Sequence, residues 1–248
     1  MTFRKLTDIS YTDTQKLDLY LPDRAGKAPL FIFFHGGGIE NGDKADPGSF
    51  AELAESGIAV ASANYRLYPE AKFPEFIEDA AAAVAWCMKK SGEEFSGVYV
   101  GGSSAGSYLS MMLAFDEHYL MQYGISPNEI DGYFFDDGQP TTHYNVLRER
   151  GLDTRLVRVD EAAPIYFLKD AKDVEKFPKY LFIVTDNDMP VRLEQNVMMI
   201  KTMEHFGYPK EKIQFLMIPG YEHTGYMGVK NADGTSFYAK LIRSFIGG

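Results

Sequence analysis

One serine lies between two glycines where a predicted strand gives way to a predicted helix. Residues 102–106 read Gly-Ser-Ser-Ala-Gly, after the apolar run Val98–Val100 and before the helical pattern Tyr108–Phe115. Glycines two positions before and after Ser104 leave room for a tight, strained turn that lifts a serine out of a sheet. Ser103 is the competing serine, but only Ser104 has a glycine at both offsets. Backbone N–H groups at a helix start favour developing negative charge, so we predict Ser104 as an acyl-transfer nucleophile.

A second group of glycines follows an earlier apolar run. His35-Gly36-Gly37-Gly38 comes directly after Leu30–Phe34. Acyl transfer produces an oxyanion, and glycine backbones can bring N–H donors close to it because no side chain obstructs the approach. We expect the N–H groups of Gly37, Gly38 and Ala105 to form this oxyanion hole. His35 is expected to fix the loop rather than to act as a base.

A serine hydroxyl needs a general base, and the base needs a carboxylate that orients it. Around serine turns of this kind the chain order is serine, then an acid, then histidine. Of five histidines, His223 follows the apolar run Ile213–Ile218 closely, and we predict it as the base. The others are expected mainly at the surface, with His143 also a candidate for substrate contact: His118, His143 and His205.

The orienting carboxylate has two candidates in the loop after the apolar run Tyr180–Val184. Asp186 lies nearer the end of the predicted strand, whereas Asp188 stands further out, where it could reach a histidine on the neighbouring loop. Asp188 also precedes Pro190, the expected start of a helix, where an aspartate can serve as an N-cap. We prefer Asp188 as the acid and keep Asp186 as the alternative.

These candidates all stand beside apolar runs that are typical of strands. Phe3–Ser10 and Lys16–Leu21 predict an N-terminal hairpin. Continuous apolar runs suit strands buried on both faces of a parallel sheet. Six such strands are predicted, at Leu30–Phe34, Ile58–Ala63, Val98–Val100, Tyr133–Phe135, Tyr180–Val184 and Ile213–Ile218. Helical patterns fill the gaps, so the sequence predicts an α/β fold, a doubly wound and mainly parallel sheet with flanking helices.

Three helical patterns carry an apolar face each. Pro74 starts the first, and Lys90 and Gly92 suit its C-terminal end. Pro190 starts the second, and Phe237 lies at the start of a closing helix. The expected apolar face of the second helix comprises Leu193, Val197, Ile200 and Met203.

One stretch, 138–177, is polar and irregular and lies between two predicted strands. It is comparatively basic, with Arg148, Arg150, Arg155 and Arg158. We expect it to form a lid insertion at the edge of the sheet, within a single domain that spans 1–248.

Composition excludes several classes of protein. The 248 residues are 45% hydrophobic and include one cysteine, which rules out wholesale disorder, a disulfide framework and a cysteine-based zinc ribbon. The net charge of −10 argues against binding to nucleic acids or to anionic membranes. Apolar stretches stay far short of the roughly 20 residues of a membrane span. Residues 1–8 lack the apolar core of a secretory signal, so we expect a cytoplasmic protein. The histidines lack metal-ligand spacing, and neither a metal nor another cofactor is expected.

The serine turn, the glycine loop, the late aspartate and the late histidine together resemble the α/β-hydrolase fold. Tyr65-Arg66-Leu67-Tyr68-Pro69-Glu70, then Phe73-Pro74 and Glu78-Asp79-Ala80, is similar to a pattern of the hormone-sensitive-lipase-like branch. That branch contains bacterial carboxylesterases and acetylesterases, and kynurenine formamidases are near relatives. The resemblance runs from the strand at Lys16 to His223.

The resemblance implies a triad of Ser104, Asp188 and His223, with Gly37, Gly38 and Ala105 around the oxyanion. This sequence departs from the pattern of the branch at two places that bear on the substrate. Ser103 stands where the branch often has aspartate, and Ile39-Glu40 follows the glycines where the branch has an aromatic residue.

We therefore expect a serine esterase that hydrolyses small carboxylic esters through an acyl-enzyme, with a small-molecule ester as its partner. Acetylated carbohydrates are one candidate substrate, with Thr141–Asn145 donating hydrogen bonds to hydroxyl groups. An amidase or formamidase would use the same triad, and a non-catalytic binding module on this fold is a further alternative. The sequence predicts no particular acyl length, alcohol or oligomeric state.

Overall fold

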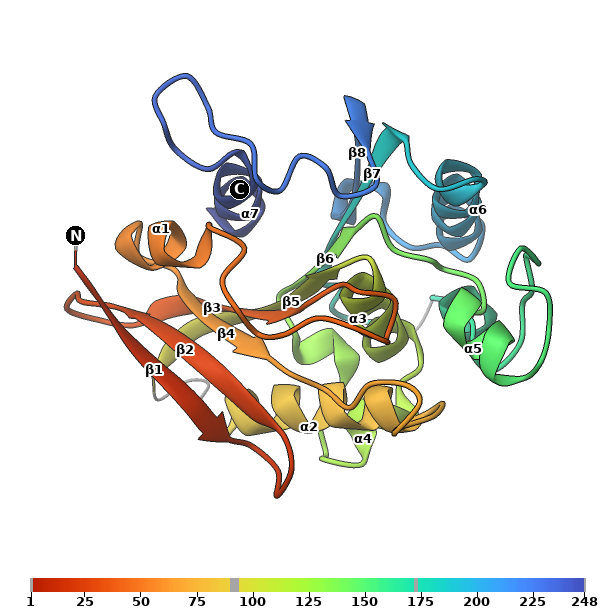
Figure 1. Ribbon diagram of the computed structural model, residues 1–248, viewed down its shortest axis with the longest axis horizontal. Coiled ribbons are helices and arrows are strands. Elements are labelled where there is room, and N and C mark those ends of the chain that lie inside the picture. The colour runs from red at the N-terminus through yellow and green to blue at the C-terminus, as the bar shows by residue number, and fades with distance from the viewer. Residues whose placement is uncertain (1, 90–93, 172–173, 248) are drawn as a thin grey trace.

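A computed structural model describes residues 2–89, 94–171 and 174–247 (Figure 1). In this part of the chain eight strands form one sheet, in the order β1-β2-β4-β3-β5-β6-β7-β8. The strands are β1 Phe3–Ser10, β2 Lys16–Pro22, β3 Ala28–Phe34, β4 Ala59–Ala63, β5 Phe95–Ser103, β6 Gly132–Asp136, β7 Lys179–Asn187 and β8 Ile213–Glu222. The pairs β1–β2 and β2–β4 are antiparallel, and all the others are parallel. The predicted fold class is confirmed.

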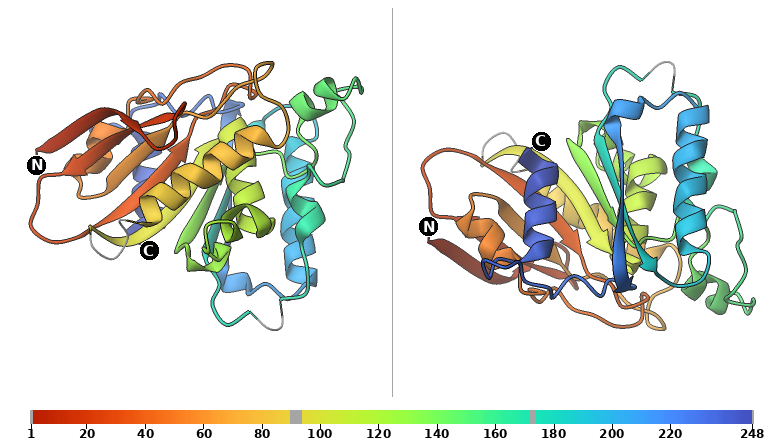
Figure 2. Two further views of the ribbon diagram at one scale, coloured as in Figure 1. Left: turned by 90° about the horizontal axis from the view of Figure 1, so that it is seen from below. Right: turned by 90° about the horizontal axis from the view of Figure 1, so that it is seen from above.

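Helices cover both faces of the sheet (Figure 2). The α-helices are α1 Phe50–Glu55, α2 Glu75–Met88, α3 Ala105–Phe115, α4 His118–Met121, α5 Tyr144–Glu149, α6 Arg192–His205 and α7 Phe237–Gly247. Three short 3-10 turns accompany them, η1 Pro127–Glu129, η2 Pro164–Phe167 and η3 Lys210–Lys212. Helices α1 and α7 pack on one face of the sheet, and α2, α3 and α6 on the other. None of the helices described is both long and apolar enough to cross a bilayer.

Two apolar cores explain the continuous apolar run of β3. Alternate residues of a strand point to opposite faces. Leu30, Ile32 and Phe34 enter the core under α2 and α3, whereas Phe31 and Phe33 enter the core under α1 and α7. Because both faces are covered, the strand has no polar side to present to water.

The run at Ile213–Ile218 does not behave in this way. It lies in β8, the last strand of the sheet, and Phe215 and Met217 are 42% and 46% exposed. The expectation of a strand buried on both faces is wrong here, because an edge strand has a neighbour on one side only.

Two helix predictions also change. The buried side of α6 carries Gln195, Asn196 and Met199, whereas Val197, expected on the apolar face, is exposed. Polar side chains turn inward there because they bond the loop after β6, as when Asn196 Nδ2 donates to the Gly138 carbonyl. For α2, the predicted C-terminal residues Lys90 and Gly92 lie outside the described residues, and the helix is capped at Lys89.

The segment 138–177 contains α5 and η2, and its residues 172 and 173 lie outside the described part. Its first residues are not an exposed polar loop. Thr141, Thr142, His143 and Asn145 are buried, so the surface position expected for His143 is wrong. The side chains of Thr141, Thr142 and His143 form hydrogen bonds inside the protein, as when Thr141 Oγ1 donates to Gln195 Oε1 of α6 at 2.8 Å.

Candidate active site

Strand β5 ends in a strained turn at Ser104. The φ angle of Ser104 is +54°, a value that costs a non-glycine residue energy, and α3 begins at the next residue. A Cβ added to Gly106 would lie 1.9 Å from the Phe34 carbonyl oxygen. The turn can therefore pack against β3 only with glycine there. The Ser104 N–H donates to the Asp136 carbonyl at 2.8 Å, which ties the turn to β6.

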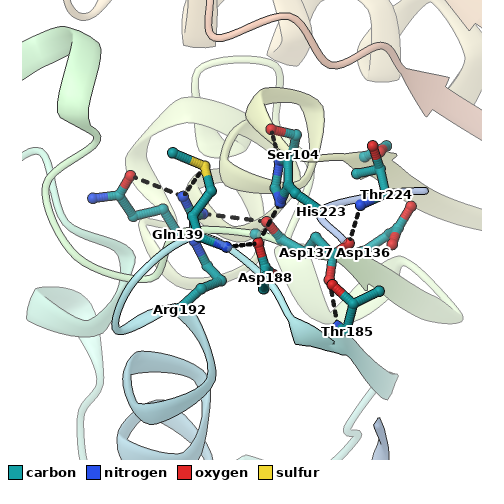
Figure 3. A network of polar contacts seen from close by, with 12 residues as sticks. Ser104, Asp136, Asp137, Gln139, Thr185, Asp188, Arg192, His223 and Thr224 are labelled. Atoms are coloured by element: carbon teal, nitrogen blue, oxygen red, sulfur yellow. Dashed lines mark hydrogen bonds and ion pairs between the residues drawn. The ribbon is translucent and has the colours of Figure 1, made fainter. Parts of the chain in front are cut away.

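Three residues predicted from the sequence meet above the ends of β5, β7 and β8 (Figure 3). His223 Nε2 lies 2.8 Å from Ser104 Oγ, within hydrogen-bond distance. The other ring nitrogen, Nδ1, lies 2.5 Å from Asp188 Oδ1. The Asp188 side chain is 2% exposed and that of His223 is 23% exposed, so the acid is shielded while the base reaches the site. This arrangement allows His223 to take a proton from Ser104.

The alternative acid, Asp186, points elsewhere. Its Oδ1 accepts the N–H of Gly220 at 2.7 Å, and the residue is exposed. Asp188 does not cap α6, because the residue before that helix is Val191. The structure therefore brings Asp188, and not Asp186, to the histidine.

The glycine loop after β3 faces Ser104. Gly37 and Gly38 have φ angles of +98° and +66°, which favour glycine. Within the described chain, neither backbone N–H donates to a protein acceptor, so both remain available to a ligand. The Ala105 N–H stands at the first position of α3, where helix geometry offers it no partner.

His35 fits the predicted loop-fixing role. Its Nδ1 lies 2.8 Å from the Gly36 carbonyl oxygen, and its ring stacks on Tyr65 with centroids 4.4 Å apart. Burial lowers the pKa of His35, which favours the neutral ring. The remaining surface predictions fit for His118 and His205, both exposed.

A cavity of about 650 Å³ opens over Ser104 and His223. Its wall includes the glycine loop together with Tyr144 and Met189, and Glu40 and Asp43 add carboxylates. Of the Thr141–Asn145 stretch, Tyr144 alone lines it. The cavity is large enough for a small ester with a polar alcohol part.

Sequence reasoning missed two carboxyl groups at the end of β6. Asp136 is fully buried and accepts a hydrogen bond from the Tyr226 hydroxyl. Burial raises the pKa of Asp136 to about 6. Asp137 accepts the N–H groups of Thr185 and Thr224. Burial, aided by the charges of Asp136 and Asp188, raises the pKa of Asp137 to about 9. Two aspartates after the run Tyr133–Phe135 were the available signal, of the same kind that pointed to Asp186 and Asp188.

Asp137, Asp188 and His223 also form a group that could hold a cation, since their ligand atoms lie within 4.8 Å of one another. The state of these ligand atoms favours bound protons over a bound cation. His223 Nδ1 already lies at hydrogen-bond distance from Asp188. The raised pKa of Asp137 favours its protonated form at neutral pH. A divalent ion would need the carboxylate of Asp137 and the bare nitrogen of His223.

Comparison with known proteins finds similarity to ester hydrolases and to a formamidase. The family model BD-FAE matches residues 17–133. The carboxylic ester hydrolase LipN of Mycobacterium tuberculosis is 39% identical over 100 residues, which cover 38% of this chain and 27% of LipN. The kynurenine formamidase of Danio rerio is 27% identical over 252 residues, which cover 98% of this chain and 82% of the formamidase. The match to LipN thus spans about a quarter of that relative.

Solved structures show the same fold. A truncated carbohydrate esterase from gut microbiota superposes with a TM-score of 0.75 at 20% identity, covering 98% of this chain and 95% of the other. A bacterial heroin esterase gives a TM-score of 0.72 at 22% identity, covering 98% and 84%. The fold, with the serine turn after β5, is that of the α/β-hydrolases. Among α/β-hydrolases, the chain is similar to the hormone-sensitive-lipase-like carboxylesterases, which confirms the resemblance found in the sequence and supports the predicted enzyme class.

Proposed function

We propose that the protein is a serine esterase that hydrolyses small carboxylic esters, with Ser104, His223 and Asp188 as its catalytic triad. The observation that carries the proposal is the double contact of His223, with Nε2 at 2.8 Å from Ser104 Oγ and Nδ1 at 2.5 Å from Asp188. This is the geometry that nucleophilic catalysis by serine requires.

In the first half-reaction, His223 Nε2 takes the hydroxyl proton while Ser104 Oγ attacks the ester carbonyl carbon. The carbonyl oxygen becomes an oxyanion, which accepts the N–H groups of Gly37, Gly38 and Ala105. His223 then gives its proton to the departing alkoxide, which leaves as the alcohol. In the second half, His223 takes a proton from water as the water oxygen attacks the acyl carbonyl carbon, and returns that proton to Ser104 Oγ as the bond between this oxygen and the acyl carbon breaks and the acid leaves. Throughout, Asp188 stabilises the imidazolium.

The test uses p-nitrophenyl acetate and two serine variants. Ser104→Ala removes the nucleophile and is expected to lower kcat by at least about 10³-fold, as in comparable triads. Ser103→Ala is the matched control, because Ser103 Oγ bonds Met227 Sδ, whereas the serine hydroxyl that His223 contacts is that of Ser104. Turnover retained in Ser104→Ala would contradict the assignment. If the unmutated protein hydrolyses no ester in a panel of increasing acyl length that includes acetylated sugars, a binding module is favoured.

Hydrolysis of a formamide is the second candidate function. It is favoured by the kynurenine formamidase of Danio rerio, whose match covers nearly the whole of this chain. The same triad can attack an amide carbonyl, with His223 protonating the amine. Comparing kcat/KM for an aryl acetate and for N-formylkynurenine separates the two, and a preference for the formamide would replace the ester proposal.

We further propose that the enzyme works as one cytoplasmic domain without a metal or another cofactor. Burial raises the pKa of Asp137 to about 9, which disfavours the carboxylate form that a cation at this cluster would need. The 138–177 segment is proposed as the lid, since Tyr144 of α5 lines the cavity and Arg148 is ion-paired with Glu40 beside it.

A further inference from the structure

A second cavity, of about 230 Å³, lies beside the catalytic one and shares Tyr144 and Met189 with it. It forms between the 138–177 segment and the start of α6. Its lining contains two arginines, Arg155 and Arg192, and no carboxylate. The triad does not use any of these residues, so the cavity needs a separate explanation.

Arg192 is the distinctive group in this wall. The residue is 4% exposed, yet no carboxylate of the described chain lies within the 4.0 Å of an ion pair with it. Its guanidinium donates to the Asp137 carbonyl at 3.2 Å and to Gln139 Oε1 at 3.5 Å, and approaches Met189 Sδ at 3.6 Å (Figure 3). All three acceptors are uncharged. The charges of Asp188 and Asp137 offset part of the cost of burying this guanidinium, but burial has the larger effect and lowers the pKa of Arg192. An anion in the adjoining cavity would offset more of that cost.

The surroundings of Arg192 add to the positive potential. Arg155 lines the cavity with a side chain that is 88% exposed, and its charge is shared with Asp153 at 2.6 Å. Pro190 and Val191 lead into α6, a 14-residue helix whose positive N-terminal end therefore borders the cavity. Gln139 and Gln195 offer neutral amide groups.

The catalytic cavity has the opposite character. Glu40 and Asp43 contribute carboxylates to its wall, and neither lines the second cavity. Glu40 is ion-paired with Arg148, but Asp43 still makes the wall near Ser104 less favourable for an anionic part of a substrate than the wall beyond Tyr144, where Arg155 and Arg192 lie. A planar carboxylate is the ligand that a guanidinium fork binds best.

We propose that the second cavity is a subsite for a carboxylate carried by the ester substrate, with Arg192 and Arg155 as its ligands. The ester carbonyl would then lie at Ser104 while the carboxylate lies on the far side of Tyr144 and Met189. This proposal rests on the proposed esterase function and narrows its substrate class to esters that carry a second, ionised carboxyl group.

The test compares charged and neutral esters in matched pairs. 4-Acetoxybenzoate and its methyl ester place the charge on the alcohol, and monophenyl adipate and its methyl ester place it on the acyl chain. After correction for the rates with hydroxide, we expect kcat/KM to be about tenfold higher for the charged member of at least one pair. The preference should weaken at high salt, because Arg155 is exposed.

Three arginine variants test which side chains cause the preference for charged esters. Arg155→Gln and Arg192→Gln are expected to bring the charged-to-neutral ratio down towards one. Arg158→Gln is the matched control from the same segment, because Arg158 is ion-paired with Asp160 and does not line the cavity; it should keep the ratio. If Arg192→Gln fails to fold, as a thermal melt would show, Arg155→Gln still decides.

The failure of the subsite and the failure of the esterase proposal give different results. Ester turnover with equal efficiency on both members of each pair overturns the subsite and leaves the esterase. A preference that persists in every folded arginine variant also overturns it. Should no ester be hydrolysed, calorimetry on the Ser104→Ala protein decides, with adipate expected to bind more tightly than neutral adipamide and equal or absent binding counting against the subsite.

Discussion

Asp137 accepts the backbone N–H of Thr224 at 2.6 Å and so fastens the end of β6 to the residue that follows His223. Its other oxygen accepts the N–H of Thr185 in β7 at 2.9 Å. One carboxyl group thus joins the ends of the strands that precede the acid and the base. Because burial raises its pKa to about 9, it holds this position as a neutral acid at pH 7.

Replacing Asp137 by asparagine should therefore change the pH dependence of stability. The pKa is raised from an ordinary value of 3.8, so between about pH 4 and 9 the folded protein keeps a proton that the unfolded chain releases. The wild type loses stability as pH rises through this window, and Asp137→Asn, which cannot ionise, does not. Relative to the wild type, the variant should gain up to about 1.4 kcal/mol per pH unit.

Urea unfolding of both proteins at pH 5 and pH 8 measures this effect. Asp186→Asn is the control, because Asp186 is exposed and should give the same difference from wild type at both values of pH. A difference between Asp137→Asn and wild type that does not grow with pH would show that Asp137 is ionised in the folded protein.

The two candidate acids should separate cleanly in kinetics. Asp188→Asn removes the charge that orients and stabilises His223, and kcat for an aryl acetate should fall by roughly 10³–10⁴-fold. Asp186→Asn should stay within a few-fold of wild type, because Asp186 bonds the Gly220 N–H rather than the histidine. The opposite ranking, measured on well-folded proteins, would move the acid to Asp186.

The parts of the fold that the sequence predicted well are those governed by local pattern. The continuous apolar run of β3 indicates a strand covered on both faces, and both faces are covered. The glycines around Ser104 indicate a tight turn, and Gly106 packs against Phe34 there. The exposure of Phe215 could not be predicted in this way. It depends on β8 being an edge strand, and the order of strands is set by contacts that are distant in sequence.

The same limit holds at the site. Ser104 and His223 stand in recognisable local settings, and Asp188 is the first residue after β7, where its side chain reaches His223. Asp137 and Arg192 belong to no recognisable sequence motif. Their environment arises where β6, α6 and the 138–177 segment meet, so burial and neighbouring charge, rather than residue type, distinguish them. His143 was misplaced for the same reason, because its burial comes from packing against Tyr108 and Tyr144.

An ion pair supports the segment that precedes α2, and its loss should lower stability. Asp79, 5% exposed, accepts hydrogen bonds from the Arg66 backbone N–H at 2.9 Å and from the Arg66 side chain at 2.8 and 3.0 Å. Asp79→Ala should reduce the free energy of unfolding by about 2–3 kcal/mol, less than for a fully buried pair because the Arg66 side chain is 34% exposed.

Glu75→Gln is the control for this ion pair. Glu75 also contacts Arg66, at 3.0 Å, but its side chain is 41% exposed, and its loss should cost less than about 1 kcal/mol. Chemical denaturation of both variants gives the comparison. Equal losses would show that the buried Asp79 contact is no stronger than an exposed one.

The oxyanion loop offers a test by steric rescue. A Cβ added to Gly38 would lie 2.0 Å from the Tyr144 hydroxyl oxygen and 3.1 Å from the ring carbon that bears it. Gly38→Ala should therefore displace the loop or the tyrosine, and loss of an oxyanion donor lowers kcat by about 10²–10³-fold in comparable sites. Removing the hydroxyl in the double variant Gly38→Ala/Tyr144→Phe relieves the closer contact. It should recover about tenfold in kcat for p-nitrophenyl acetate, and incompletely, because the φ of +66° at residue 38 still disfavours alanine. Tyr144→Phe alone supplies the reference, and additive effects of the two substitutions would show that the collision is not what limits the single variant.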